Sequence, residues 1–549
     1  GYQGGNTASG SRLNTSLKDT AASVMVITKE FMADFGMNSL EEITAYTPNM
    51  GVDFLETRSD PSPGFLSGFG SDTRMRVRGL EASTAMDFFT GVVPIDSYNT
   101  ERFEVSSGPN SILFGFGNPG GLVNVMTKIA QLEKELTGLR VQFGDWSFQR
   151  YELDRNQVLV PGKFAVRLNT LYNYSEGWRT NDFQHIRRGA LSLRYKPFER
   201  TTVTANGELG RIRAHVSLPQ NAEDGSRLWV DTGSRVIDDA VWATTDRAFG
   251  INRSTAVQNY YVTNANGAVP YYIPTRNAVG GRLLVTTYED FNIPAADRVG
   301  RTLVDSKVIP FEYSLYGPGS LRFKDFKRLV VNIEQKLTDT AILELAYNRE
   351  SSKDRTEKPL NQQMILAGDP NLTIPNSTGV GAATPNPNAG KQFMETVWNP
   401  LWGETHQEVF RAALSNKFNL VKFGSHHVAG MYENHRQRIW AYQGRVIFAD
   451  SAGVPISVAA PENTANWVRQ RHYFTPGDFS TYDAKNGSAP IKINRNGVTY
   501  QSRTVVQAVG PRDVERTIQT GMVVTQSYFF DSKLVVTGGL RQDRIDYDV

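Results

Sequence analysis

The lengths of the connections between strands constrain this chain most strongly. From Leu136 onward, apolar and polar residues alternate in repeated short segments, and this period of two predicts strands with one apolar face. We count about eleven such segments, and short turns follow the even-numbered ones. The predicted strands are 138–145, 148–160, 163–175, 187–196, 200–213, 328–336, 341–351, 408–419, 424–438, 515–530 and 533–547.

Most odd-numbered strands are followed by a long connection instead, and the longest are 214–327, 352–407 and 439–514. Short turns at one end and long loops at the other are typical of a barrel of the outer-membrane type. A β-sandwich has no reason to keep this parity, and no repeat of about 40–50 residues indicates a propeller. We therefore predict a mainly β chain, in which a transmembrane antiparallel β-barrel is the main element.

Composition agrees with this fold class. The 549 residues include 59 Lys and Arg against 56 Asp and Glu, so the net charge of +3 argues against a nucleic-acid partner. The chain has no cysteine, which excludes disulfides and thiolate metal sites. No run of about 18 apolar residues predicts a transmembrane helix, and barrel strands do not need one.

The strand count carries a further expectation. Single-chain barrels of bacteria normally close with an even number of strands, and eleven is odd. We therefore expect this chain to be the N-terminal part of a longer barrel. The expected division is a flexible segment at 1–20, a small α/β domain at 21–130 and the barrel portion at 131–549.

The glycine-rich stretch from Gly115 to Gly120 matches the pattern G-x-G-x-x-G, which suggests a dinucleotide-binding loop. Such a loop needs a helix immediately after it, so that the helix N-terminus meets the pyrophosphate. Here "GLVNVMTK" follows, and its alternation predicts a strand. A soluble nucleotide-dependent enzyme is therefore disfavoured, and the glycines fit tight turns and close backbone approach.

Three N-terminal stretches resemble a known family. "YNTERFEVSSGPNSILFGFGNPGGLVNVMTK" is similar to the plug-domain signature of TonB-dependent outer-membrane receptors of the siderophore-receptor type. "LKDTAASVMVITKEFMADFGMNSLEEITAYTPNMGV" and "RVRGLEA" resemble earlier parts of the same plug. The resemblance implies a plug inside a 22-stranded barrel of the bacterial outer membrane, of which this chain would supply about half the strands.

The resemblance also implies a function and partners. A ferric siderophore would bind between the plug and the extracellular loops, and TonB with its inner-membrane energising complex would pull the plug's N-terminal segment. No chemical step is involved, so we expect no enzyme activity and no cofactor, with iron present only inside a bound chelate. Outer-membrane lipid, including lipopolysaccharide, would surround the barrel. The alternative is the same architecture importing an oligosaccharide, cobalamin or another large nutrient.

Candidate site residues come from the same resemblance. Tyr98, Arg58 and Gly91 correspond to ligand-contacting positions, although Tyr98 packing on the barrel wall and Arg58 as a solvated charge are the alternatives. Ser107 replaces an arginine usual in the family, and no TonB box is recognisable before residue 20. We expect no metal site among the seven histidines. Residues expected to hold the plug are Arg78, Gly79, Glu101, Glu104, Gly108, Pro109, Gly120 and Gly121.

Overall fold

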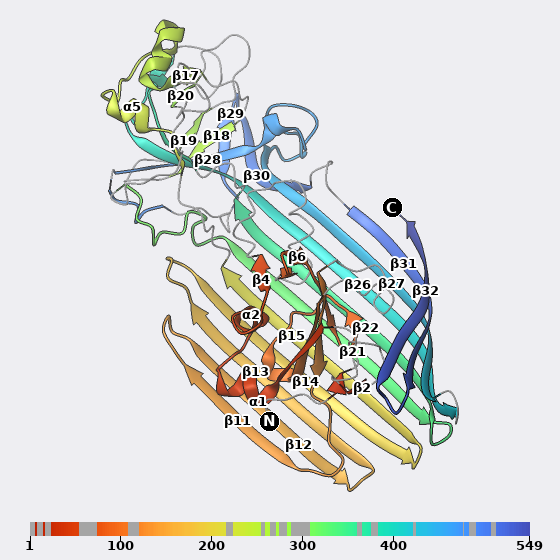
Figure 1. The fold of residues 1–549 in the computed structure, drawn as a ribbon. Helices are drawn as coiled ribbons and strands as arrows, with labels where there is room; N and C mark the ends of the chain where they lie inside the picture. Colours follow the sequence, from red (N-terminus) through yellow and green to blue (C-terminus); the bar gives the residue numbers. More distant parts are fainter. Residues whose placement is uncertain are drawn as a thin grey trace.

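A computed structural model gives the fold of the chain (Figure 1). It describes residues 6–7, 15–16, 23–53, 74–107, 120–215, 223–253, 259–263, 271–273, 283–286, 308–359, 365–374, 383–420, 424–475, 477–482, 490–506 and 512–548.

Eleven long strands form one antiparallel meander, in which each strand pairs with the next along this series. Each matches one of the predicted strands, and the short turns and long loops alternate as expected. The strands are β11 (Leu136–Phe143), β12 (Gln149–Val160), β13 (Phe164–Glu176), β14 (Phe183–Phe198), β15 (Thr201–His215), β21 (Leu321–Lys336), β22 (Ala341–Pro359), β26 (Gln392–Leu420), β27 (Gly424–Ala449), β31 (Arg512–Phe529) and β32 (Leu534–Asp548).

The long loops gather at one end of the meander, where they fold into a layer of short elements (Figure 1). β28 (Val468–Phe474) joins this layer to the barrel, because it pairs with the loop-side end of β26 and with β18 (Asn259–Val262). The remaining elements are β16 (Glu223–Asp224), α5 (Arg227–Asp231), η4 (Asp239–Val241), η5 (Thr244–Phe249), β17 (Ile251–Arg253), β19 (Tyr271–Ile273), β20 (Leu284–Thr286), β23 (Ile365–Gly368), β24 (Thr373–Ile374), β25 (Thr384–Pro385), η8 (Thr464–Asn466), β29 (Lys492–Arg495) and β30 (Val498–Val506).

The N-terminal residues form a separate α/β unit, here called the plug, which lies within the curve of the long strands (Figure 1). Its five-stranded sheet has the order β3-β9-β10-β7-β8, and β10 runs parallel to β7. The elements are β1 (Asn6–Thr7), β2 (Thr15–Ser16), β3 (Ser23–Thr28), α1 (Lys29–Asp34), α2 (Leu40–Thr44), β4 (Met50–Asp53), β5 (Arg74–Val77), β6 (Leu80–Glu81), β7 (Ser83–Met86), β8 (Phe89–Thr90), η3 (Ser97–Asn99), β9 (Thr100–Ser107) and β10 (Gly121–Thr127).

The plug has its own apolar core between the sheet and the two short helices. Met32, Ile43, Phe103 and Val123 are among its buried members, and none belongs to a barrel strand. Helix α2 is capped by the preceding Ser39, whose Oγ accepts a hydrogen bond from the backbone N–H of Glu42. Among the residues that the structure describes, no helix is long and apolar enough to cross a membrane.

The glycine pair at the start of β10 has the packing role that the sequence predicted. The backbone N–H of Gly120 donates to the carbonyl of Glu81 at 2.9 Å, and a Cβ at Gly120 would lie 2.4 Å from the carbonyl oxygen of Leu80. Gly121 has a φ of 119°, which L-residues rarely adopt. Gly120 allows the β6–β7 turn to contact the start of β10 closely, whereas Gly115 and Gly117 lie outside the described residues.

We expect Gly120→Ala to destabilise the plug by about 1–3 kcal/mol, because the new methyl group would overlap backbone atoms that have no rotamer to relax. Gly51→Ala is the matched control, since a Cβ there meets nothing within 4 Å. The measurement is the midpoint of thermal unfolding, together with the rate of protease cleavage within the plug. Equal behaviour of the two variants would contradict the close contact.

Candidate functional site

Residues 86–98 of the plug, which include the short strand β8, contact several side chains of the barrel wall and are called the anchor segment here. It runs from the end of β7 through β8 to η3, and barrel side chains donate to several of its backbone carbonyls. Buried carbonyls need such partners, and inward-facing barrel side chains supply them. Arg328 donates to Met86 O at 3.0 Å, Arg411 to Phe88 O at 2.8 Å, Arg188 to Pro94 O at 2.7 Å and Gln407 to Thr90 O.

Glu350 on β22 joins the anchor segment to the barrel's own charges. Its Oε2 accepts the backbone N–H of Val92 at 2.9 Å, while Oε1 accepts from Arg328 at 3.1 Å. Arg328 also pairs with Asp87 of the plug at 3.0 Å. A Cβ on Gly91 would lie 2.5 Å from Glu350 Oε2, so glycine is what lets the carboxylate reach Val92.

Tyr98 lies against the barrel wall with 1% of its surface exposed. Its hydroxyl donates to Glu208 Oε1 at 2.6 Å, and Arg188 pairs with the same oxygen at 2.5 Å while its guanidinium lies 5.1 Å from the Tyr98 ring centroid. Burial raises the pKa of the Tyr98 phenol well above its usual value, and the charge of Glu208 raises it further. The phenol therefore stays protonated and remains a hydrogen-bond donor.

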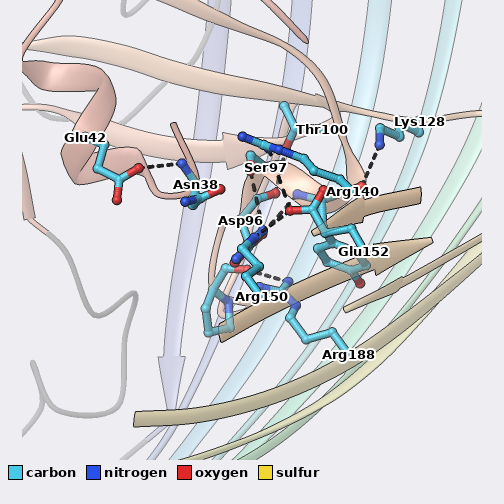
Figure 2. Close-up of polar contacts among 12 residues, drawn as sticks. Asn38, Glu42, Asp96, Ser97, Thr100, Lys128, Arg140, Arg150, Glu152 and Arg188 are labelled. Atoms are coloured by element: carbon cyan, nitrogen blue, oxygen red, sulfur yellow. Dashed lines mark hydrogen bonds and ion pairs between the residues drawn. The ribbon is translucent and has the colours of Figure 1, made fainter. Parts of the chain in front are cut away.

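Asp96 extends this contact to β12 (Figure 2). Arg150 pairs with Asp96 Oδ1 at 2.6 Å and with Glu152 Oε1 at 2.5 Å, and all three side chains are largely buried. The same Asp96 carboxylate accepts the backbone N–H of Tyr98 at 2.9 Å and so caps η3. One carboxylate thus fixes both the local turn and its position on the barrel.

The connection from the plug to β11 is also held by charges. Lys128 donates to the carbonyl of Tyr98 at 2.7 Å and pairs with Asp154 at 3.2 Å. Burial lowers the pKa of the Lys128 ammonium, and the neighbouring Asp154 opposes that shift. Arg167 pairs with Asp154 at 2.8 Å and donates to Ile129 O at 3.1 Å, so the chain is tied to β13 where it leaves the plug.

The residues that the sequence predicts to contact a ligand do not share one position in the structure. Tyr98 occupies the alternative position that the sequence left open, packed on the barrel wall, and Gly91 lies beside Glu350 in the same interface. A ligand could contact the Tyr98 hydroxyl only if the anchor segment rearranged, because Glu208 holds it. Arg58 lies outside the described residues, so its ligand contact stays a prediction.

The residues predicted to hold the plug also differ among themselves. Glu101 reaches the barrel, with Arg167 at 3.8 Å, whereas buried Glu104 pairs with Arg102 inside the plug at 2.6 Å. Arg78 and Gly79 form an exposed turn, and Arg78 makes no ion pair with any described residue. Its lock on a barrel carboxylate stays a prediction. Gly108 and Pro109 lie outside the described residues.

The barrel residues that contact the plug were not predicted from the sequence. Strands β12 to β15, β21, β22 and β26 each contribute one buried inward-facing charge to the interface or its supports. Their signal was a charged residue on the polar face of each alternating strand. The seven residues are Arg150, Arg167, Arg188, Glu208, Arg328, Glu350 and Arg411. Among the described residues, no three His, Cys, Asp or Glu side chains are arranged to hold a metal ion.

We expect Glu350→Ala to loosen the plug. It leaves Val92 N–H without its acceptor and Arg328 with one carboxylate fewer, and breaking a buried ion pair costs about 3–5 kcal/mol. The measurement is ion conductance across a planar lipid bilayer, with plug proteolysis as a second readout. Glu344→Ala is the control, because Glu344 lies on the same face of β22 and bonds Asn332 instead of the plug. Equal conductance in both variants would contradict the anchoring role.

Comparisons with known proteins agree with this architecture. A model of the TonB-dependent receptor plug domain matches residues 16–122. The ferrichrome outer membrane transporter/phage receptor of Escherichia coli K12 is 30% identical over 199 residues, which are 36% of this chain and 26% of that protein. The ferripyoverdine receptor of Pseudomonas aeruginosa is 28% identical over 155 residues, which are 28% of this chain and 18% of that protein.

Solved structures share the fold at low sequence identity. The pyoverdine receptor FpvA of P. aeruginosa has a TM-score of 0.63 at 13% identity, and the match covers all of this chain and 59% of that one. The ferric preacinetobactin receptor BauA of Acinetobacter baumannii gives 0.58 at 13%, over all of this chain and 62% of that one.

This chain spans only part of such proteins, since its match covers about a quarter of the E. coli transporter. The plug match, the curated relatives and the shared barrel nevertheless agree with one another. The chain therefore contains a TonB-dependent receptor plug domain and is similar to siderophore receptors of the bacterial outer membrane, with the plug followed by strands of a barrel of the same fold.

Proposed function

We propose that the protein imports ferric siderophores across the outer membrane in a TonB-dependent manner. The observation that carries this proposal is a plug with its own apolar core, held inside the barrel mainly through one anchor segment. Such a plug can rearrange without unfolding the barrel, whose strands are paired with one another. The names of its relatives, which include ferrichrome, ferripyoverdine and catecholate receptors, support the ligand class.

A chelated ligand suits this chemistry. A siderophore already fills the coordination sphere of iron, so its receptor needs aromatic faces and cationic donors for the organic shell and no metal ligands. Arg58 is the cationic candidate in the plug. An oligosaccharide, cobalamin or another large nutrient remains the alternative ligand for the same architecture.

Coupling to TonB would act through the N-terminal strand of the plug sheet. Among the residues that the structure describes, β3 is an edge strand whose partner is β9, from Ser23 opposite Ser107 to Thr28 opposite Arg102. A pulling force on the segment before Ser23 would therefore act first on the edge strand β3. We propose that separation of β3 from β9 is the first step that opens a path past the plug.

The pair Ser23→Cys and Ser107→Cys tests this step, because the two serines lie directly opposite each other and the chain has no other cysteine. With the disulfide formed, we expect unchanged binding of the ferric chelate and a large loss of its uptake. Reduction should restore uptake, and each single variant is a control. Full uptake by the oxidised form would show that β3 stays paired during transport.

Ligand class is tested by titrating the full-length receptor with ferric siderophores and oligosaccharides while following tryptophan fluorescence. We expect saturable quenching by one ferric chelate, and about tenfold weaker binding after Arg58→Ala, since a charged hydrogen bond contributes about 1.5–3 kcal/mol. Tyr98→Phe is the matched control, because it removes only a hydroxyl held by Glu208. A response to a glycan and to no ferric chelate would exclude a ferric siderophore as the ligand and would leave the assignment of the fold unchanged.

A further inference from the structure

Strand β26 changes its hydrogen-bonding partner near its loop-side end. From Gln392 to Val397 it pairs with β28, and from Leu401 to Leu420 it pairs with β27. Residues 398–400 therefore lie where β28 and β27 separate, and this point is called the fork here. The outward residues of β26 from Phe410 to Leu420 are mostly apolar and form the lipid-facing part of the strand, called the apolar band. The fork lies beyond this band on the loop side.

Arg445 on β27 lies at the fork with 5% of its surface exposed. Its Nη1 donates to the carbonyl of Gly444 at 2.7 Å and to Oδ1 of Asn399. The other edge of the guanidinium, formed by Nε and Nη2, donates to no residue that the structure describes, and Nε is fully buried. Burial lowers the pKa of this guanidinium to about 10. One edge of a buried cation is thus left without an acceptor.

The ring of Trp467 lies over this guanidinium, whose carbon is 4.8 Å from the ring centroid. An isolated β-bridge between Trp467 and Ile447 of β27 fixes the position of the ring. The indole Nε1 is buried and, within the described part of the chain, also has no acceptor. Buried donors in proteins are nearly always paired, so two unpaired ones in adjoining side chains indicate that an acceptor comes from outside the protein.

Lys358 brings a second positive charge to the fork. It lies directly opposite Asn399 on the paired strands β22 and β26, so both side chains are on one face of the sheet. Glu350 and Gln407, which contact the plug, lie on this same face, so it is the inward face of the barrel. Burial lowers the pKa of the Lys358 ammonium, which forms no ion pair with a described residue. Lys358 and Arg445 therefore flank Asn399 as two cations without a carboxylate.

The nearest carboxylates on these strands are already used. Glu357 lies on the outward face and accepts from Trp398 Nε1 at 2.7 Å. On the inward face, the next acidic residues along β22 and β26 are Asp354 and Glu395, and each pairs with two basic residues. The pairs are Asp354 with Arg322 at 3.2 Å and with Lys324 at 3.6 Å, and Glu395 with Arg469 at 3.2 Å and with Arg471 at 2.7 Å.

We propose that the fork binds an oxyanion, with two of its oxygens on the Nε and Nη2 edge of Arg445 and its charge neutralised by Lys358. A guanidinium edge presents two parallel N–H groups, which match the spacing of oxygens in phosphate, sulfate and carboxylate groups. Trp467 Nε1 supplies a further donor beside them. Because Arg445 and Trp467 are buried, the bound group is small: a free inorganic ion or one acidic group of a larger molecule.

The bound anion would stabilise the loop layer. Lys358, Arg445 and Trp467 come from β22, from β27 and from the loop that follows β27. An oxyanion that contacts all three joins the ends of two barrel strands to this loop, where the ladder between β26 and β27 has ended. Occupancy should therefore slow the separation of the loop from the strands. This role does not depend on which nutrient is imported.

The test follows the full-length receptor while sodium chloride is replaced by sodium phosphate or sodium sulfate at constant ionic strength. The readouts are tryptophan fluorescence and the rate of protease cleavage in the loop layer. We expect a saturable fall in cleavage, which Arg445→Gln abolishes. Lys358→Gln should weaken the response about tenfold, since it removes one charged contact to the anion.

Lys353→Gln is the matched control. Lys353 lies on the same strand as Lys358 but faces outward, where it pairs with Glu404 at 3.0 Å, so its loss should leave the anion response unchanged. Heat-resistant migration in gels confirms that each variant is folded. Lys358→Gln keeps the proposal testable if Arg445→Gln does not fold, because Lys358 has no hydrogen bond to a described residue that its loss would break.

A second arm identifies the source of the oxyanion. In chloride alone, the receptor is titrated with two ferric chelates, one with a free carboxylate and one without. Protection by phosphate or sulfate would identify a free ion, whereas protection by the carboxylate chelate alone would place a group of the nutrient at the fork. No response to any oxyanion, or an unchanged response in both Arg445→Gln and Lys358→Gln, would overturn the proposal. Either failure leaves siderophore import untouched, because the fluorescence titration with Arg58→Ala tests that separately.

Discussion

The backbone of the anchor segment is the constraint on which the rest of the structure depends. An irregular chain inside a barrel exposes carbonyls and N–H groups that no strand ladder satisfies. Arg188, Arg328, Arg411 and Glu350 satisfy them from the wall. These same charges would be costly if the plug were absent, because each would lose a partner. The plug and the wall therefore stabilise each other, although each has its own core or ladder.

The strand order was predictable because it depends on a local pattern, whereas strand length was not. β26 was predicted as 408–419 and β27 as 424–438, but they extend over Gln392–Leu420 and Gly424–Ala449. The loop-side parts lie beyond the apolar band, where Glu404, His406 and Arg438 face outward. Both faces are polar around those residues, and further toward the loops both faces are buried in the loop layer, as with Met394 and Trp398 on β26. The alternation of apolar and polar residues that marks a strand therefore disappears although the hydrogen-bonded ladder continues.

The contacts of the site were harder to predict than its elements. Alternation shows that Glu208 faces the inside of the barrel, but its partner Tyr98 is 110 residues away in the sequence. The resemblance to known plugs assigned Tyr98 to the ligand, since a motif carries no information on which barrel residue lies beside it. Gly91 illustrates the same limit. Its lack of a side chain matters because Glu350 approaches, and that is visible only once the plug and barrel are in place.

Arg187 and Arg188 show how a single strand serves two environments. Arg188 faces inward and is buried between Glu208, the ring of Tyr98 and the carbonyl of Pro94. Arg187 faces outward, directly opposite Arg211 on the paired strand. The residue type is the same, yet the inward charge is neutralised by Glu208, whereas the outward charge has no acidic partner among the residues that the structure describes.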